Sequence, residues 1–309
     1  MKLYILKRNM IYGVCNCPED VKIPVNDYEA YDMYPDYQYV YDKLWVAQSQ
    51  DLDCGTCEDM PTELPVIIRP KTNLAGMGKG TYYINNKEDI KFIPNRYFWT
   101  EVLEGDHMSI DMFVYEGSVE DYVVFQGFPQ TGFTFNYWEY INYYELPINI
   151  RFWIREKIKG FHGMINIEMI GDKIIEVHLR MGDLNYFQSK LLTQKVINHY
   201  NKIEVVFLPP LCKIYLVPVF ARKGEYTRVN DEDIYAIARH FDYAFVDSRF
   251  YQIDPPPSEV GNPLGGDRIC NLIVTDLEIG FQIRDMILKK YYGNCWQRMY
   301  VNWIIRDVF

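Results

Sequence analysis

The segment Val66–Gly80 combines cationic side chains with glycines, which is the combination that bound phosphate groups require. An apolar, β-branched run leads into cationic residues and then into a glycine-rich loop. The residues concerned are Arg69, Lys71, Gly76, Gly78, Lys79 and Gly80. Glycines expose backbone N–H groups beside the cationic side chains, as polyphosphate binding needs. The segment predicts a phosphate-binding loop, with a simple hairpin turn as the alternative.

A second segment, Ile165–Arg180, has the pattern of a β-hairpin with acidic residues on both strands. Glu176 and His178 are two residues apart, so they share one face of a strand, which Arg180 continues. Such a face suits a hard divalent cation held against phosphate oxygens. Glu168 and Glu176 lie inside apolar runs, where an unpaired carboxylate is costly, so we expect a metal ion as their partner. Pairing with Lys or Arg on a solvated hairpin is the alternative.

The turn of this hairpin decides whether Glu168 and Glu176 can share one metal ion. A two-residue turn at Gly171 and Asp172 sends the two carboxylates to opposite faces of the sheet. A three-residue loop places Glu168 directly across from Glu176, with about 4.5 to 5.5 Å between Cβ atoms. A shared metal ion therefore requires an odd loop or a bulge, and we predict that one is present.

The order and spacing of these segments resemble the ATP-grasp superfamily, whose members clamp ATP between two α+β subdomains. The resemblance covers roughly residues 38 to 185, about half of the chain. In that family a helix lysine, a Lys-Pro strand end with a glycine-rich loop, an adenine hinge and an acidic hairpin follow in this order. The corresponding segments here are Asp42-Lys43, Arg69-Pro70 with the glycines, Thr100–Gly105, and Glu168 with Glu176–Arg180.

The resemblance implies a role for each of these residues. Those that would hold the phosphate groups are Lys43, Arg69, Lys71, Gly76, Gly78 and Lys79. Those at the adenine and the ribose would be Glu101, Leu103 and His107. Those that would hold one or two Mg²⁺ or Mn²⁺ ions are Glu168, Glu176 and His178. Glu176 and Arg180 would be catalytic, with Arg180 stabilising charge on the γ-phosphoryl group or on an acyl phosphate.

Three positions depart from the family pattern and leave two functions open. Arg69 stands where lysine is usual, His107 where an acid often binds the ribose, and His178 where the metal-site asparagine is expected. Arginine offers a planar fork rather than a point charge, and histidine is softer than an amide oxygen. The implied function is an ATP-dependent ligase that activates a small-molecule or peptide carboxylate as an acyl phosphate for attack by an amine or thiol. The alternative is a catalytically decayed, ATP-grasp-like nucleotide-binding or structural protein.

The composition limits the class of protein and its partners. With 309 residues, 49% of them hydrophobic, the chain can bury a large core and is long enough for an enzyme. A net charge of −10 argues against nucleic acid or an anionic membrane as a partner. The sequence shows no signal-peptide pattern and no apolar run of about 18 residues, so we expect a cytoplasmic protein. The seven cysteines are expected to be reduced thiols, with a zinc site at Cys15, Cys17, Cys54 and Cys57 as the alternative.

The expected fold class is α+β, an ATP-grasp-like nucleotide clamp of two subdomains. We place its core at residues 38–188, a short N-terminal extension at 1–37 and a C-terminal α/β region at 189–309. An apolar stripe over residues 37–50 predicts a helix with Lys43 near its edge, where ordinary solvation is the alternative to phosphate contact. The C-terminal region should hold a strand at 213–220, a helix at 231–241 and a strand plus helix over 269–290. Its loop at 262–268 is either an ordinary connection or a lid that carries an arginine.

Overall fold

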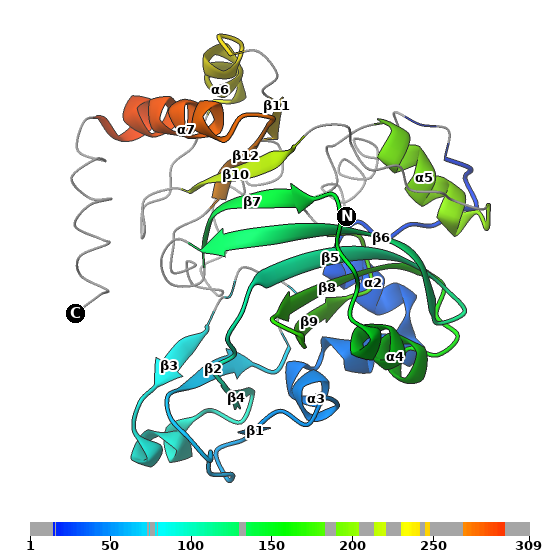
Figure 1. Cartoon of the computed structure of the whole chain (residues 1–309), viewed down its shortest axis with the longest axis vertical. Coiled ribbons are helices and arrows are strands. Elements are labelled where there is room, and N and C mark those ends of the chain that lie inside the picture. Colours follow the sequence, from blue (N-terminus) through cyan, green and yellow to red (C-terminus); the bar gives the residue numbers. More distant parts are fainter. Residues whose placement is uncertain are drawn as a thin grey trace. The chain divides into compact units, whose positions relative to one another are not determined.

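The structure is a computed structural model of the whole chain, and its elements are labelled in Figure 1. It describes residues 15, 17–72, 74, 78, 80–129, 134–182, 190–203, 213–220, 230–241, 245–247 and 268–293. Gly76, Lys79 and most of the loop at 262–268 lie outside these ranges. Helices and antiparallel strands are mixed along the chain, which confirms the expected α+β class. The chain divides into two compact units, which we describe separately.

The first unit contains a sheet that carries the predicted acidic hairpin. Its strands are β5 (His107–Tyr115), β6 (Ser118–Pro129), β8 (Gly163–Ile170) and β9 (Lys173–His178), in the order β9-β8-β5-β6. The last residues of β6 already belong to the second unit. β5, β8 and β9 are antiparallel neighbours, and their side chains alternate between two faces.

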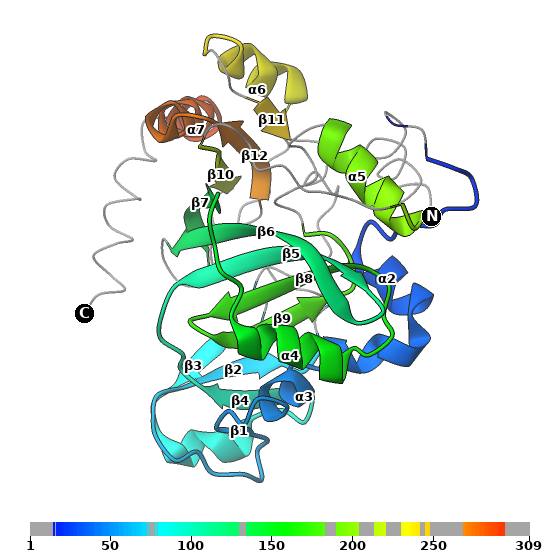
Figure 2. The same cartoon turned by 45° about the vertical axis from the view of Figure 1, so that its right-hand side comes forward.

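One face of β5, β8 and β9 is apolar and forms the main core. Its side chains include Ile110, Ile167 and Val177, each at most 1% exposed. Helix α4 (Ile148–Lys157), which begins after Pro147, packs on this face through Ile154 and its neighbours. Figure 2 shows α4 lying along β8 and β9. The opposite face is therefore left to carry the polar side chains of the same strands.

Helix α5 (Lys190–Tyr200) covers one end of the polar face. The buried His199 side chain donates from Nε2 to the backbone oxygens of Val114 and Gly163, at 3.2 Å each. Its ring also meets the Phe113 ring edge-on, with 5.1 Å between the centroids. The rest of the polar face holds the predicted site residues.

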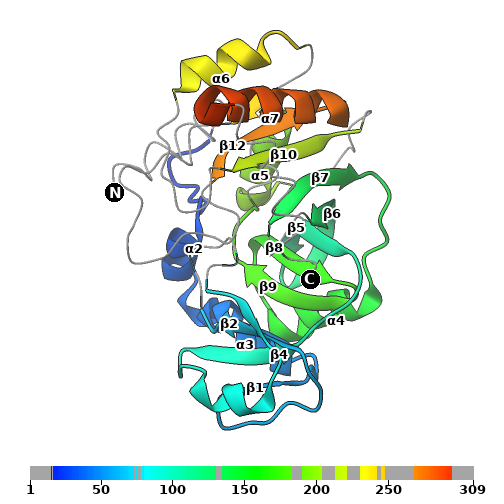
Figure 3. The same ribbon diagram turned by 90° about the vertical axis from the view of Figure 1, so that its left-hand side faces the viewer.

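A smaller antiparallel sheet completes the first unit. Its strands are β1 (Cys54–Gly55), β2 (Val66–Pro70), β3 (Tyr82–Ile84) and β4 (Tyr97–Glu101), in the order β1-β4-β2-β3. The 3₁₀ helix η2 (Lys87–Phe92) adds Ile90 to an apolar core that includes Ile68 and Trp99. β3 pairs antiparallel with β2, as the glycine-rich turn between them predicts. Figure 3 shows α3 (Lys43–Gln48) beside this sheet.

The predicted helix over residues 37–50 is instead two short helices. A 3₁₀ helix, η1 (Pro35–Tyr41), ends at Asp42, and α3 begins directly after it. The Asp42 carboxylate accepts hydrogen bonds from the N–H groups of Leu44 and Trp45 and so caps α3. The cap breaks the helix and turns Lys43 into the interior, where its side chain is only 6% exposed. The expected position at the edge of an apolar stripe was therefore wrong. A further helix, α2 (Asp27–Met33), precedes η1.

The second unit is a separate α/β arrangement. Its strands are β7 (Phe135–Ile141), β10 (Tyr215–Phe220), β11 (Phe245–Asp247) and β12 (Arg268–Val274), in the order β7-β10-β12-β11. Helices α6 (Asp231–Ala238) and α7 (Leu277–Tyr292) pack on the apolar residues of β10 and β12. The predicted strands and helices of this region are confirmed. The Asn230 side chain caps α6 by accepting from Glu232 N. Among the described helices, none combines the length and apolar character that crossing a membrane requires.

Candidate functional site

The polar face of β5, β8 and β9 arranges the predicted site residues in two rows across the strands. The first row is Asp111, Asn166 and His178. The second row is Ser109, Glu168 and Glu176. The three residues predicted to hold a metal ion therefore lie on one face in adjacent rows. Asn166 links the two rows, because its amide donates to Asp111 at 2.9 Å and to Ser109 at 3.0 Å.

A β-bulge in β9 brings Glu168 and Glu176 opposite each other. The turn has two residues, Gly171 and Asp172, and Met169 pairs with Ile174. Glu168 lies one position before Met169 on β8, but its partner Glu176 lies two positions after Ile174 on β9. β9 therefore has one extra residue here. The predicted odd loop or bulge is confirmed, and it takes the form of a bulge.

Side chains from two other elements hold this bulge. The Gln50 amide, which follows α3, pairs with Ile174 as a strand would, donating to its oxygen at 2.9 Å and accepting from its N–H at 2.8 Å. Arg69 of β2 donates from Nη1 to the Ile175 oxygen at 2.9 Å. These contacts give partners to backbone groups at and beside the bulge, on a strand that lies at the edge of the sheet.

Glu176 lies at the centre of a charged cluster in which it contacts three cationic or potentially cationic groups. Lys43 Nζ is 2.8 Å from Oε1, Arg69 Nη2 is 3.6 Å from Oε2, and His178 Nε2 is 3.5 Å from Oε1. Burial lowers the pKa of both Lys43 and Arg69, and the Glu176 charge opposes that effect. Lys43 is thus neither solvated nor isolated, and it lies beside Arg69 as a phosphate clamp requires.

Glu168 is held in its ionised form on the same face. His107 Nε2 lies 3.3 Å from its Oε2. Burial raises the pKa of Glu168, but the hydrogen bond and charge of His107, together with His178 and Lys43, lower it to about 2. Glu168 is therefore a carboxylate at neutral pH, which is the form that a divalent cation needs. His107, predicted at the ribose, contacts this predicted metal ligand, and its role at the ribose stays a prediction.

Asp27 is a buried site residue that sequence reasoning missed. Its side chain is 4% exposed, with Oδ1 2.9 Å from His178 Nδ1 and Oδ2 2.7 Å from Arg180 Nη2. Burial alone would raise the pKa of Asp27, but the Arg180 and His178 side chains hold it well below its usual range. The same carboxylate and that of Glu176 raise the pKa of His178 against the effect of burial. A metal ion at His178 would have to compete with the proton that these carboxylates favour.

A narrow pocket lies next to Lys43 and Arg69. Its lining includes Thr100 and Leu103, the second of which was predicted at the adenine. The cavity volume is about 10 Å³. This is room for about one water molecule. Thr100 Oγ1 is buried without a hydrogen-bond partner in the described part of the chain, so a polar group is available to a ligand.

The hinge segment around this pocket is anchored on the hairpin turn. Gly171 N donates to the Asp106 oxygen at 3.0 Å. Gly171 has a φ of +60°, and a Cβ there would lie 2.8 Å from the Glu104 oxygen. Glu101, the other predicted adenine residue, uses its carboxylate to accept from the Asp53 N–H at 2.9 Å. Of the two predicted adenine residues, only Leu103 lines the pocket.

The other predicted phosphate-binding residues are placed only in part. The Lys71 oxygen accepts from Lys43 N at 2.8 Å, which ties the end of β2 to the start of α3. Gly78 and Gly80 have φ values of +60° and +78°, a conformation that glycine adopts without strain. Gly76 and Lys79 lie outside the described residues, so their predicted roles stay predictions.

The carboxylates and histidines do not form a ready-made metal site. Across the residues that the structure describes, no three His, Cys, Asp or Glu side chains are grouped to hold a metal ion. The alternative zinc site at the four N-terminal cysteines therefore finds no support in their arrangement. At the hairpin, the opposed carboxylates of Glu168 and Glu176 are suitable hard donors, but each is engaged by a cationic or histidine side chain. A divalent cation fits this donor set once those contacts are exchanged.

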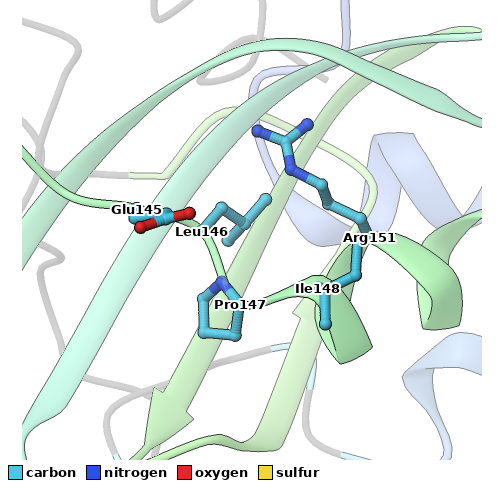
Figure 4. Close-up of a pocket in the computed structure, with 5 residues that line it drawn as sticks. All are labelled: Glu145, Leu146, Pro147, Ile148 and Arg151. Atoms are coloured by element: carbon cyan, nitrogen blue, oxygen red, sulfur yellow. The ribbon is translucent and has the colours of Figure 1, made fainter.

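A larger hollow lies away from these residues, at the start of α4. Figure 4 shows it between Glu145, Leu146, Pro147, Ile148 and Arg151, with a volume of about 460 Å³. The Arg151 guanidinium lies 5.4 Å from the centre of the Tyr122 ring. None of the predicted site residues lines this hollow, so it does not enter the assignment of the site.

Comparison with solved structures shows the ATP-grasp fold in this chain. An L-amino acid ligase from Bacillus licheniformis aligns with a TM-score of 0.53 and 12% identity, covering 85% of this chain and 70% of the ligase. An N5-carboxyaminoimidazole ribonucleotide synthetase from Thermotoga maritima aligns with a TM-score of 0.54 and 12% identity, over 85% of this chain and 78% of the synthetase.

An N5-carboxyaminoimidazole synthetase from Staphylococcus aureus, complexed with ADP, aligns with a TM-score of 0.56 and 11% identity. The alignment covers 82% of this chain and 72% of that synthetase. No protein-family model matches the sequence, and no curated protein matches it either. The likeness therefore concerns the fold, and the residues of the site carry the argument about function.

Proposed function

We propose that the chain is an ATP-dependent ligase that activates a carboxylate as an acyl phosphate, which an amine or thiol then attacks. The observation that carries the proposal is the buried cluster in which Lys43 and Arg69 meet Glu176, opposite Glu168. Two cations and a carboxylate in one interior location, with a second, partly exposed carboxylate opposite, need a reason, because burying charges costs free energy even when they are paired. A magnesium–ATP complex supplies that reason.

The charged cluster matches the charges of that complex group by group. Phosphate oxygens would replace Glu176 as the partner of Lys43 and Arg69. The divalent cation would bind the carboxylates of Glu176 and Glu168. Each charged group would exchange its present partner for a new partner that carries the same charge as the old one, so no charged group would be left unpaired. With ligand absent, the cluster neutralises itself. Mg²⁺ or Mn²⁺ held there would offset the charge on the phosphate oxygens.

The remaining predicted residues complete the proposed site. Leu103 would lie against the adenine, with Glu101 and His107 nearby, while Lys71, Gly76, Gly78 and Lys79 would cover the phosphates. The pocket beside Leu103 has a cavity volume of only about 10 Å³, so it must widen before a base can enter. His178 would take part in the metal site, and Arg180 would stabilise charge on the transferred phosphoryl group. A cytoplasmic location, expected from the sequence, belongs to the same proposal.

One observation favours the alternative of a nucleotide-binding protein without turnover. His178, at a position proposed for a metal ligand, is engaged at both ring nitrogens, by Asp27 at 2.9 Å and by Glu176 at 3.5 Å. This network would persist as a purely structural unit if catalysis had been lost. The two candidates share nucleotide binding and differ in product release.

Release of ADP, measured with a panel of carboxylates and amines in the presence of Mg²⁺ or Mn²⁺, tests the proposal. The panel should include L-amino acids and aminoimidazole ribonucleotide, because the names of structural neighbours include them. A ligase releases ADP only when both acceptor and donor are present. Nucleotide affinity without ADP release for any pair would favour the alternative.

A further inference from the structure

Helix α2 delivers one buried carboxylate to two residues of the proposed site. Asp27 is the first residue of α2, and the Asn26 side chain caps the helix by accepting from Glu29 N at 3.0 Å. The cap fixes the direction in which Asp27 leaves the backbone. Its two oxygens then reach His178 and Arg180, which lie two positions apart along the chain that continues β9.

The Arg180 guanidinium is held by the Asp27 carboxylate and by the backbone. The Arg180 guanidinium donates to Asp27 at 2.7 Å and to the Met181 oxygen at 3.1 Å. Leu179, which lies between His178 and Arg180, is held by a residue of η1, because Leu179 N donates to the Tyr41 hydroxyl at 3.1 Å. The backbone and the guanidinium of this short stretch are thus both anchored by the α2–η1 segment.

Asp27 also links Arg180 to the charged cluster. His178 donates from Nδ1 toward Asp27, and its other nitrogen lies 3.5 Å from Glu176. One carboxylate therefore sets the orientation of a histidine beside the metal-binding acids and of an arginine beyond it. If a buried carboxylate only filled space, an apolar side chain of similar size would make the protein more stable. Its two directed partners indicate a role in positioning.

We propose that Asp27 is a positioning residue that holds Arg180, and through His178 the acidic cluster, in the geometry that meets the γ-phosphoryl group of ATP. The proposal rests on the proposed function. It makes α2 a working part of the nucleotide site, although α2 lies in the segment that the sequence assigns to an N-terminal extension. The two Asp27 oxygens are engaged by His178 and Arg180, so its effect on the γ-phosphoryl group must pass through Arg180 and its effect on the acidic cluster through His178.

The test compares affinities for Mg·ATP and Mg·ADP, measured by displacement of a fluorescent nucleotide. The proteins are the wild type, Asp27→Asn, Arg180→Gln and the double variant, with Asp32→Asn, an exposed acid of the same helix, as the control. Asp27→Asn keeps the size of the side chain and removes its charge. Asp27→Glu keeps the charge and displaces it, so a second variant is at hand if the first does not fold.

Each single substitution should weaken ATP binding about tenfold, as expected for losing one charge-assisted hydrogen bond, and change ADP binding less than about twofold. The double variant should be no weaker than Arg180→Gln alone, because the two residues act as one unit. Asp32→Asn should bind both nucleotides as the wild type does. A merely structural role would lower the melting temperature without changing the ratio of the two affinities.

Two results would overturn parts of the account separately. Asp27 does not act through Arg180 if Asp27→Asn or Asp27→Glu keeps the wild-type ratio of ATP to ADP affinity. The same holds if the losses of ATP affinity caused by Asp27→Asn and Arg180→Gln add in the double variant. Nucleotide binding by the protein would stand in both cases. If the wild type binds neither nucleotide, the proposed function itself fails.

Discussion

At the scale of single residues, Glu176 is the side chain on which the proposed mechanism depends most. It contacts Lys43 at 2.8 Å and Arg69 at 3.6 Å and faces Glu168 across the hairpin. Sequence periodicity was enough to place Glu176 and His178 on one face of a strand. It could not identify their partners Lys43 and Asp27, because these lie far away in the sequence and carry no local pattern.

Glu176→Gln should abolish ADP release while leaving ATP binding largely intact. An amide cannot neutralise the divalent cation that bridges the phosphates, whereas Lys43 and Arg69 remain to bind them. Steady-state ADP release and equilibrium nucleotide binding measure the two effects. Glu156→Gln, at a 65% exposed position on α4, serves as the control and should change neither. Full ADP release by Glu176→Gln would remove this residue from the metal site.

His199 should make the free energy of unfolding depend on pH. Burial, with a smaller effect of His162, lowers the pKa of His199 from its ordinary 6.5 to about 4. Between these values the unfolded chain binds more protons, so stability rises with pH in this window and falls on acidification. His199→Gln should flatten the curve between about pH 7 and pH 4.5 by an amount on the order of 2 kcal/mol.

Denaturant unfolding at several pH values measures this dependence. His240→Gln, at an exposed position on the chain after α6, is the control and should leave the curve unchanged. His178 affects the free energy of unfolding in the opposite direction. Its pKa is raised, so its contribution to stability is lost as pH rises. Only the difference between wild type and His199→Gln isolates His199, and parallel curves for the two proteins would contradict the assignment.

At the scale of elements, the β-bulge in β9 determines what the hairpin can do. Counting residues showed that a regular two-residue turn would separate Glu168 from Glu176, so the need for an irregularity was predictable. What holds the bulge was not, because Gln50 pairs with Ile174 across 124 positions of sequence. The broken helix around Asp42 was missed for a different reason, since a capping aspartate inside an apolar stripe outweighs the stripe.

Gln50→Ala should loosen the bulge and destabilise the hairpin. Removing the amide leaves the N–H and oxygen of Ile174 without these partners, which costs about 1–3 kcal/mol for a buried group. Hydrogen exchange at Ile174 N–H should become faster, and turnover should fall because Glu176 loses its register. Gln48→Ala, at an exposed position on α3, is the matched control. Unchanged exchange at Ile174 would show that Gln50 does not hold the bulge.

At the scale of the whole molecule, local sequence patterns predicted the α+β class, the β2–β3 turn and the elements of the second unit. They did not predict which cation meets which carboxylate, since folding brings these together over long separations. The ATP-grasp fold, inferred from the order of weak motifs, is shown by the structural comparison. Asp27 belongs to the site only because α2 folds back on β9.

Stabilisation by Mg·ATP is the most direct test of the central claim, that Lys43 and Arg69 beside the acidic hairpin bind nucleotide. A ligand that binds only the folded protein adds RT ln(1 + [L]/Kd) to the free energy of unfolding, about 2.7 kcal/mol at a hundredfold excess over Kd. The melting temperature should therefore rise with Mg·ATP in the wild type and in Arg96→Ala, where an exposed cation near β4 is removed. Arg69→Ala should lose most of the rise. A melting temperature that saturating Mg·ATP leaves unchanged in the wild type and in both variants would contradict the account.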